Sequence, residues 1–270
     1  QTLPVELIEL IVVENGQRSE TASIVREFAE RNPGLSVTYL FEEVANVGHA
    51  RNVGIERATG KYITFVDDDD YLEPNYLLSM WLSASDESLV IGLLADESLS
   101  GERNIETPNN NRVFALEGGR HPLRNRSGLL GLNACKLIPS RLVKQISYEV
   151  SLPSGEDTVF MSQLLRFEDL DLVPCSPMAR AMYVRRMSEN SISRQPVSFN
   201  FCVEQRVDVI NCLIKTRDEI HKRNAGAINY LIDNQSSFIR KFYSENPTRQ
   251  EEVRTYISDN CLDDRVIRLS

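Results

Sequence analysis

Three short strand-like runs, separated by segments with helical periodicity, constrain the fold of this chain most strongly. Residues 7–13 are nearly all apolar, which predicts a strand buried on both faces of a parallel sheet. Residues 35–41 and 61–66 are rich in β-forming residues and predict two more strands. The intervening segments predict a helix after Ser19 and another over residues 50–58. Strand, helix and strand repeated at this spacing predict an α/β fold with a mainly parallel sheet flanked by helices.

The second half of the chain changes in character toward its C-terminal end. The predicted elements are a helix from Pro74 to Trp81, a strand over residues 89–94, a loop over 96–111, a helix over 158–167, and helices over 199–223 and 227–243. We therefore divide the chain into an α/β domain over residues 1–195 and a helical extension over residues 196–270.

Composition excludes several classes of protein. The chain has 270 residues, of which 41% are hydrophobic and 26% are charged, as in an ordinary globular protein. Its formal net charge of -9 would repel a polyanion, so nucleic acid is not an expected partner. We expect no transmembrane segment, because no apolar run approaches the roughly 20 residues that span a bilayer. Five scattered cysteines without a CxxC pair favour reduced thiols and the cytoplasm, including the inner face of the cell membrane.

Four consecutive aspartates, Asp67 to Asp70, directly follow the third predicted strand. Adjacent carboxylates repel one another and raise each other's pKa unless a cation lies between them. Oxygen ligands favour Mg²⁺ or Mn²⁺, which keep coordination positions open for phosphate oxygens. The alternative is a solvated acidic loop. The end of a strand in an open parallel sheet is where ligands bind, and this position favours the cation site.

Five blocks of residues carry a resemblance to a known family. They are residues 12–16 (VVENG), 46–54 (NVGHARNVG), 60–70 (GKYITFVDDDD), 154–158 (SGEDT) and the stretch from Tyr183 to Ser193 (YVRRMSENSIS). In order and spacing they resemble the family 2 glycosyltransferases, over roughly residues 5–195. The resemblance implies a GT-A fold, which is Rossmann-like, and it does not cover the helical region after residue 196. It also implies that the first strand of the family is missing from this chain.

The resemblance also implies roles for individual residues. Asp157, with Glu156 beside it, is expected to be the catalytic base, and Asp69 and Asp67 are expected to bind Mg²⁺ or Mn²⁺. The residues expected to bind the nucleotide-sugar donor are Glu14, Asn15, Asn46, Arg51, Asp67 and Asp68. The family has two aspartates where this chain has Glu14 and Asn15, so a uracil preference is not carried over.

The reaction implied is transfer of a sugar, with inversion, from a nucleoside-diphosphate sugar to an acceptor hydroxyl. The acceptor would be a glycan, a lipid-linked molecule or another hydroxyl compound in the synthesis of cell-surface polysaccharide or glycoconjugates. The sequence leaves peripheral membrane contact and homo-oligomer formation open. One alternative is an inactive module of the same fold that binds a sugar nucleotide or a glycan. Another is nucleotidyl transfer, against which the SGEDT block and the Ser-Ile-Ser residues 191–193 argue.

Asp157, Arg51 and Lys136 each have a purely structural alternative. Ser154 and Asp157 fit a capping box, in which the acid stabilises the first turn of a helix. Arg51 fits an exposed helical position paired with a glutamate. Lys136 lies in a segment that also resembles the family, but it would serve equally well as a surface lysine packing its stem on the protein.

Overall fold

The computed structural model describes residues 1–116, 118–175, 182–187 and 197–269. The strands in these ranges form three sheets. The first sheet has two strands, β1 (Glu9–Asn15) and β2 (Ser36–Glu42). The second has five strands in the order β3 (Tyr62–Ile63), β9 (Lys136–Pro139), β5 (Ser88–Ile91), β10 (Asp171–Pro174) and β8 (His121–Pro122). The third has four strands in the order β4 (Tyr71–Leu72), β11 (Met182–Arg186), β6 (Leu93–Glu97) and β7 (Arg103–Asn104).

Parallel pairing dominates these sheets by length. The pairs β1 with β2, β5 with β10 and β6 with β11 are parallel and join four to seven residue pairs each. The antiparallel pairings of β3, β4, β7, β8 and β9 join two residue pairs each. The result confirms the predicted α/β fold, in which sheets flanked by helices precede a helical C-terminal region.

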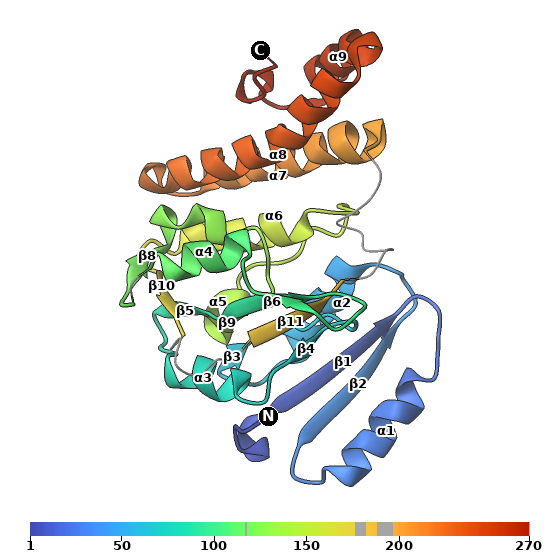
Figure 1. The fold of residues 1–270 in the computed structure, drawn as a ribbon, viewed down its shortest axis with the longest axis vertical. Helices are drawn as coiled ribbons and strands as arrows, with labels where there is room; N and C mark the ends of the chain where they lie inside the picture. Colours follow the sequence, from blue (N-terminus) through green and yellow to red (C-terminus); the bar gives the residue numbers. More distant parts are fainter. Residues whose placement is uncertain (117, 176–181, 188–196, 270) are drawn as a thin grey trace.

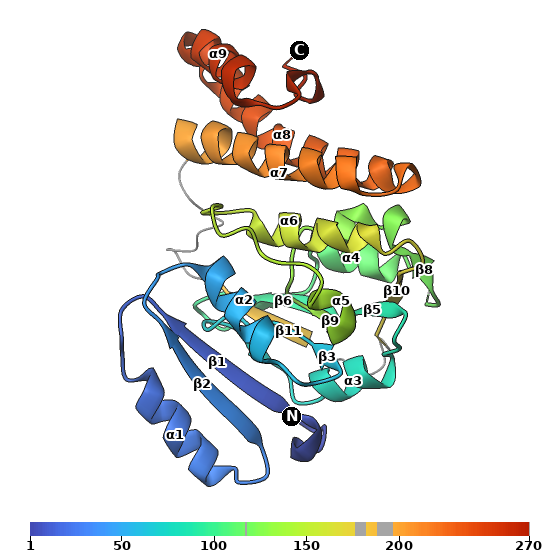
Figure 2. The ribbon, with the colours of Figure 1, turned by 180° about the vertical axis from the view of Figure 1, so that it is seen from behind.

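The helices lie in layers around the sheets (Figures 1 and 2). They are α1 (Thr21–Arg31), α2 (Val47–Arg57), α3 (Tyr76–Leu82), α4 (Pro108–Phe114), α5 (Ser140–Val143), α6 (Glu156–Ser162), α7 (Gln205–Glu219), α8 (Ala225–Glu245) and α9 (Gln250–Asn260). Helix α1 lies beside β2, and α2 packs on β1. Helices α7 and α8 lie side by side over α6, and we call this pair the helical layer.

The apolar core runs from the five-stranded sheet through α6 into the helical layer. Leu89, Phe160, Val207 and Ile228 are fully buried members of it. Each such side chain contributes about 1.5 to 3 kcal/mol relative to leaving it in water. The predicted helices over residues 199–223 and 227–243 are confirmed as α7, with a preceding π-helical turn (Asn200–Glu204), and α8.

The two-stranded sheet departs from the predicted burial. Residues 7–13 were expected to form a strand enclosed on both faces, but every residue of β1 keeps part of its surface exposed. No residue of α1 or β2 is buried either, so this sheet lies outside the main core. Among the described residues, β1 pairs with β2 alone. The missing first strand stays a prediction.

The third predicted strand is much shorter than residues 61–66. Only Tyr62 and Ile63 form β3, and they pair antiparallel with β9. Beyond the ladder, the partly buried Phe65 packs against the core, with its ring 5.8 Å from that of Tyr148 and 5.9 Å from that of Phe160. Aromatic packing therefore decides the backbone path into the four aspartates.

The predicted strand over residues 89–94 is divided at Gly92. Its two parts, β5 and β6, belong to different sheets. The N–H group of Gly92 donates to the carbonyl oxygen of Cys135 at 2.8 Å. A Cβ atom on Gly92 would lie 3.0 Å from Tyr76 Cε2 and 3.1 Å from Met80 Sδ, so the crossing depends on the absence of a side chain.

The predicted loop over residues 96–111 contains structure. It includes the end of β6, all of β7 and the beginning of α4. Helix α4 begins after Thr107, whose Oγ1 accepts a hydrogen bond from Asn110 N at 3.1 Å, and Pro108 occupies the first turn. The buried side chain of Asn110 also bonds both backbone groups of Leu94. The loop prediction was wrong because these partners are not adjacent in sequence.

The remaining boundaries shift by a few residues or stay untested. Helix α6 begins at Glu156 and ends at Ser162, where a 3₁₀ turn (Gln163–Arg166) continues the predicted helix. The proposed domain boundary after residue 195 and the Ser191–Ser193 block lie outside the described residues.

No helix within the described ranges is both long and apolar enough to cross a bilayer.

We expect Gly92→Ala to lower the free energy of unfolding by about 1 to 3 kcal/mol, because the new methyl group meets two fully buried side chains. Gly226 in α8 is a matched control, since a Cβ atom there meets nothing within 4 Å. Gly226→Ala should be neutral or should gain up to about 1 kcal/mol. Urea unfolding followed by circular dichroism measures both. Equal stability of the two variants would contradict the close packing at Gly92.

Candidate active site

Helix α2 carries the central side chain of the site. It begins after Asn46, whose Oδ1 accepts a hydrogen bond from His49 N at 2.7 Å, and whose Nδ2 donates to the carbonyl oxygen of Val150 at 2.8 Å. Asn46 therefore starts the helix and also fixes it to a distant loop. Arg51 follows in the second turn, with only 12% of its side chain exposed.

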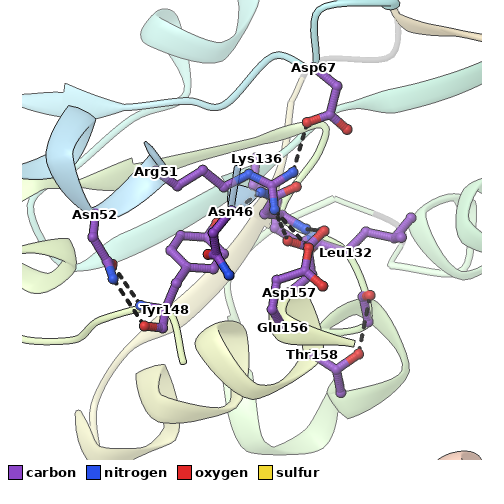
Figure 3. Close-up of polar contacts among 12 residues, drawn as sticks. Asn46, Arg51, Asn52, Asp67, Leu132, Lys136, Tyr148, Glu156, Asp157 and Thr158 are labelled. Atoms are coloured by element: carbon purple, nitrogen blue, oxygen red, sulfur yellow. Dashed lines mark hydrogen bonds and ion pairs between the residues drawn. The ribbon is translucent and has the colours of Figure 1, made fainter. Parts of the chain in front are cut away.

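The guanidinium group of Arg51 contacts three carboxylates (Figure 3). Its Nη1 lies 2.9 Å from Glu156 Oε1 and 2.8 Å from Asp157 Oδ1, and its Nη2 lies 2.8 Å from Asp67 Oδ1. Glu156 and Asp157, which were predicted to act on the acceptor, and Asp67, which was predicted to bind the donor and the metal, thus contact the same guanidinium group. Burial disfavours the charge on Arg51, but Asp157 and Asp67 outweigh burial and raise its pKa above the ordinary value. Arg51 therefore does not occupy the exposed position on a helix that was its structural alternative.

Asp157 is the more perturbed member of the Glu156–Asp157 pair. Burial raises the pKa of Asp157 to about 7; Arg51 opposes the shift, whereas the charges of Glu156 and Asp67 add to it. Its second oxygen, Oδ2, accepts a weak hydrogen bond from the N–H group of Asn133 at 3.4 Å. A carboxyl group with a pKa near neutrality is suited to act as a general base.

The capping-box alternative for Asp157 is not formed. Helix α6 begins after Gly155, and no side chain caps it. The hydroxyl of Ser154 instead donates to Gln205 Oε1 at 2.6 Å and accepts a hydrogen bond from Arg206. The position of Asp157 therefore depends on contacts outside its own helix.

The four aspartates form a tight turn rather than an extension of the strand. Asp70 N donates to Asp67 O at 3.1 Å. The buried hydroxyl of Tyr183 accepts a hydrogen bond from Asp67 N at 3.1 Å and donates to Asp70 Oδ2 at 2.7 Å. Asp70 Oδ1 also accepts from Arg186 N at 2.9 Å. Burial nevertheless raises the pKa of Asp70. Asp70 is thus anchored to the protein, and Tyr183 holds both ends of the turn.

The middle of this turn is open to a ligand. Asp68 and Asp69 are exposed, and their carboxylates make no hydrogen bond to any described residue. Asp67, which pairs with Arg51, keeps 43% of its side chain exposed. The part of the chain that the structure describes holds no preformed group of three metal-ligating side chains. One or two carboxylates fit Mg²⁺ or Mn²⁺, since these ions take their remaining ligands from water and substrate phosphates.

Glu14 and Asn15, which were predicted to bind the donor, end β1. The carboxylate of Glu14 accepts hydrogen bonds from Ser19 N at 2.7 Å, from Ser19 Oγ at 2.6 Å and from the hydroxyl of Tyr39. These bonds, that of the Ser19 hydroxyl foremost, lower the pKa of Glu14. Glu14 therefore shapes the turn before α1. Asn15 makes no side-chain hydrogen bond to any described residue and is the freer of the two.

Tyr148 supports the site and was missed by the sequence analysis. Its ring stacks on Phe160, with centroids 3.9 Å apart and planes 4° apart, and lies 5.3 Å from the guanidinium carbon of Arg51. Asn52, next to Arg51, clamps its backbone: Tyr148 N donates to Asn52 Oδ1 at 2.8 Å, and Asn52 Nδ2 donates to Tyr148 O at 3.0 Å. The arginine and asparagine of the 46–54 block thus have separate tasks.

Lys136 is a second support, and the surface alternative for it was wrong. The residue is fully buried. Its Nζ donates to the carbonyl oxygens of Leu132 at 2.5 Å and Ala134 at 3.3 Å (Figure 3). Burial lowers the pKa of Lys136. These bonds hold the loop that presents the N–H group of Asn133 to Asp157. The only sign of a role for Lys136 in the sequence was that it lies in a segment, before the SGEDT block, that resembles the family.

The family match lies in the N-terminal half of this chain. Residues 1–134 match Glycosyl transferase family 2. The putative glycosyltransferase EpsH of Bacillus subtilis is 37% identical over 81 residues, which are 30% of this chain and 23% of EpsH. The poly(ribitol-phosphate) beta-N-acetylglucosaminyltransferase TarS of Staphylococcus aureus is 24% identical over 225 residues, which are 82% of this chain and 38% of TarS. The chain therefore spans less than two fifths of either curated relative.

Solved structures extend the likeness to nearly the whole fold. The crystal structure of S. aureus TarS 1-349 in complex with UDP-GlcNAc matches with a TM-score of 0.61 and 19% identity, over 90% of this chain and 66% of that one. Mannosyltransferase PcManGT from Pyrobaculum calidifontis, in complex with GDP-Man and Mn²⁺, matches with a TM-score of 0.51 and 13% identity, over 91% and 68% of the two chains. These likenesses show the GT-A fold. The chain therefore belongs to glycosyl transferase family 2, and residues 1–134 carry the family match.

Proposed function

We propose that this chain transfers a sugar, with inversion, from a nucleoside-diphosphate sugar to an acceptor hydroxyl. The observation that carries the proposal is the convergence of Asp67, Glu156 and Asp157 on the guanidinium group of Arg51. It joins the two groups of carboxylates that such a transfer needs, one beside the departing diphosphate and one beside the attacking hydroxyl. Family membership supports the same reaction.

Asp157 is the base that removes the proton from the acceptor hydroxyl. Its pKa near 7 leaves a large ionised fraction at neutral pH while keeping the carboxylate basic enough to accept a proton. The hydroxyl oxygen then forms a bond to the anomeric carbon as the bond to the nucleoside diphosphate breaks. Glu156, which shares Arg51 Nη1 with Asp157, keeps the guanidinium group in place during this proton transfer.

Asp69 and Asp67 would hold Mg²⁺ or Mn²⁺, and the metal would stabilise the negative charge on the leaving diphosphate. The exposed carboxylate of Asp69 and the half-exposed carboxylate of Asp67 support this assignment. In the same proposal, Asp68 and Asn46 bind the nucleotide-sugar donor, as do Asn15 and Glu14 at the end of β1. Mn²⁺ accompanies GDP-Man in the PcManGT structure, which supports a divalent ion in the fold.

The class of donor, the biosynthetic role and the cellular location are also part of the proposal. TarS binds UDP-GlcNAc and PcManGT binds GDP-Man, which supports a nucleotide-sugar donor without selecting a base. The names of TarS and of the minor teichoic acid biosynthesis protein GgaB support a role in cell-surface polysaccharide synthesis. We place the chain in the cytoplasm, facing a glycan, lipid-linked or other hydroxyl acceptor.

We expect Asp69→Asn to lower metal-dependent release of nucleoside diphosphate by at least about 100-fold, because a developing charge loses its counterion. Wild-type protein should release the diphosphate only with Mg²⁺ or Mn²⁺ present. Asp86→Asn is the control, since Asp86 pairs with Lys61 on the surface away from the site. Turnover without metal that survives Asp69→Asn would overturn the role of Asp69.

We expect kcat/KM to rise with pH through about 7 and then level, because Asp157 must be ionised to accept a proton. Asp157→Asn should remove this limb and lower kcat by about 10²- to 10⁴-fold. Glu251→Gln is a matched control, because Glu251 also lies in the first turn of a helix, α9, far from Arg51. A pH profile of the same shape in Asp157→Asn would show that another group is the base.

We expect one nucleoside diphosphate to raise the melting temperature more than the others in the presence of Mn²⁺. Binding at 100 times the dissociation constant stabilises a protein by about 2.7 kcal/mol. A thermal-shift panel of uridine, guanosine, adenosine and cytidine diphosphates measures the preference, with Asp69→Asn as the control. Stabilisation by none of them would contradict a donor site, whereas donor binding without any turnover would support the inactive binding module.

A further inference from the structure

Arg206, in the first turn of α7, is a buried cation that pairs with no carboxylate among the described residues. Only 4% of the residue is exposed. Its Nη1 donates to Gln235 Oε1 of α8 at 2.9 Å, and its Nη2 donates to the hydroxyl of Ser154. Its guanidinium carbon lies 4.9 Å from the ring centroid of Phe201 and 5.5 Å from that of Phe238. The charge is therefore held by neutral groups alone.

Such an arrangement is unfavourable by itself, because a guanidinium group loses its hydration on burial. Burial accordingly lowers the pKa of Arg206, although the nearby charge of Glu156 opposes the shift. The Nε atom has no hydrogen-bond partner in the described part of the chain. The two bonds that Arg206 does make join α8 to the turn that precedes α6.

Two consecutive residues of α7 hold the hydroxyl of Ser154. Arg206 donates to it, and it donates to Gln205 Oε1 at 2.6 Å. A hydroxyl group has one hydrogen and accepting lone pairs, so both partners are satisfied at once. Ser154 lies two residues before Glu156 and is itself buried. The side chain that a capping box would direct toward α6 is thus directed toward the helical layer.

Gly155 brings the backbone of the same turn against α7. Its φ angle is +80°, and a Cβ atom on it would lie 2.8 Å from Val209 Cγ2 and 3.4 Å from Arg206 Nη1. The left-handed conformation and the close approach both require glycine here. Helix α7 therefore encloses the turn at Ser154 and Gly155, directly before the two carboxylates that contact Arg51.

We propose that Arg206 is a positioning residue, through which the helical layer fixes the turn at Ser154 and Gly155 and so directs Glu156 and Asp157 toward Arg51. The inference deepens the proposed function, in which these carboxylates serve the acceptor. It also gives the C-terminal helices a task in the site, beyond covering the core. A displacement of about 1 Å in a catalytic group is enough to cost about 100-fold in rate.

Hydrogen–deuterium exchange of the full chain tests the anchoring without any substrate. We expect Arg206→Met, which keeps a long side chain but removes the guanidinium group, to speed exchange in peptides covering residues 150–162 by about tenfold or more, since local opening loses two tying bonds. Exchange in β1 and α1 should not change. Arg217→Met is the matched control: Arg217 lies on the same helix and pairs with Asp218 and Asp263 instead.

The transfer assay separates positioning from general loss of structure. Arg206→Met should lower kcat by about 10- to 100-fold while the donor KM changes less than about threefold, because the donor side of the site is untouched. Arg206→Lys, which keeps the charge but cannot reach both Ser154 and Gln235, should lie between wild type and Arg206→Met. If wild type shows no turnover with any donor, the proposed function fails while the exchange result still decides the anchoring.

Ser154→Ala removes the same contact from the other end and serves if Arg206→Met does not fold. It should speed exchange over residues 150–162 in the same way, with the melting temperature within a few degrees of wild type. The proposal is overturned if a folded Arg206→Met or Ser154→Ala exchanges like wild type in this segment. It is equally overturned if Arg217→Met produces the same local effect.

Discussion

The contact between one guanidinium group and three carboxylates is the interaction on which the site depends. Arg51 is largely buried, and so are Glu156 and Asp157, so each charge would be costly without the others. Removing one partner of a buried ion pair typically costs about 3 to 5 kcal/mol, because the remaining charge is left uncompensated. Arg51 is therefore the condition for Asp67 to lie beside Glu156 and Asp157, which are distant from it in sequence.

The residues around that contact hold its partners in place. Asn46 and Asn52 fix α2 to the loop and to Tyr148, which places Arg51. Tyr183 holds the aspartate turn, and Lys136 holds the loop against Asp157. The main core ends in the helical layer, which encloses the start of α6. The two-stranded sheet contributes through α2, although its own residues remain partly exposed.

Local patterns in the sequence predicted the parts of this arrangement whose cause is local. Helical periodicity predicted α7 and α8. The ordered motifs selected Arg51, Asp67 and Asp157 as site candidates, and the structure brings the three side chains into contact. The pattern could not show that Phe65 leaves the sheet to pack on Tyr148, or that Gly92 divides a strand, because both depend on partners 12 to 83 residues away. The burial of Lys136 and of Arg206 was not predicted for the same reason, since a buried cation has no periodic signature.

The charge balance around Arg51 connects the site to its proposed ligand. Three carboxylates face one guanidinium group, so negative charge is left uncompensated. Burial is the main cause of the raised pKa of Asp157, and the charges of Glu156 and Asp67 add to it although Arg51 opposes the shift. Asp67 is where a cation could reduce this negative charge, because it is the most exposed of the three and adjoins the open carboxylates of Asp68 and Asp69. A divalent cation beside Asp67 would weaken the repulsion felt at Asp157 and lower its pKa. In the proposed function, donor binding on one side of Arg51 and basicity on the other would thus be linked through a single side chain.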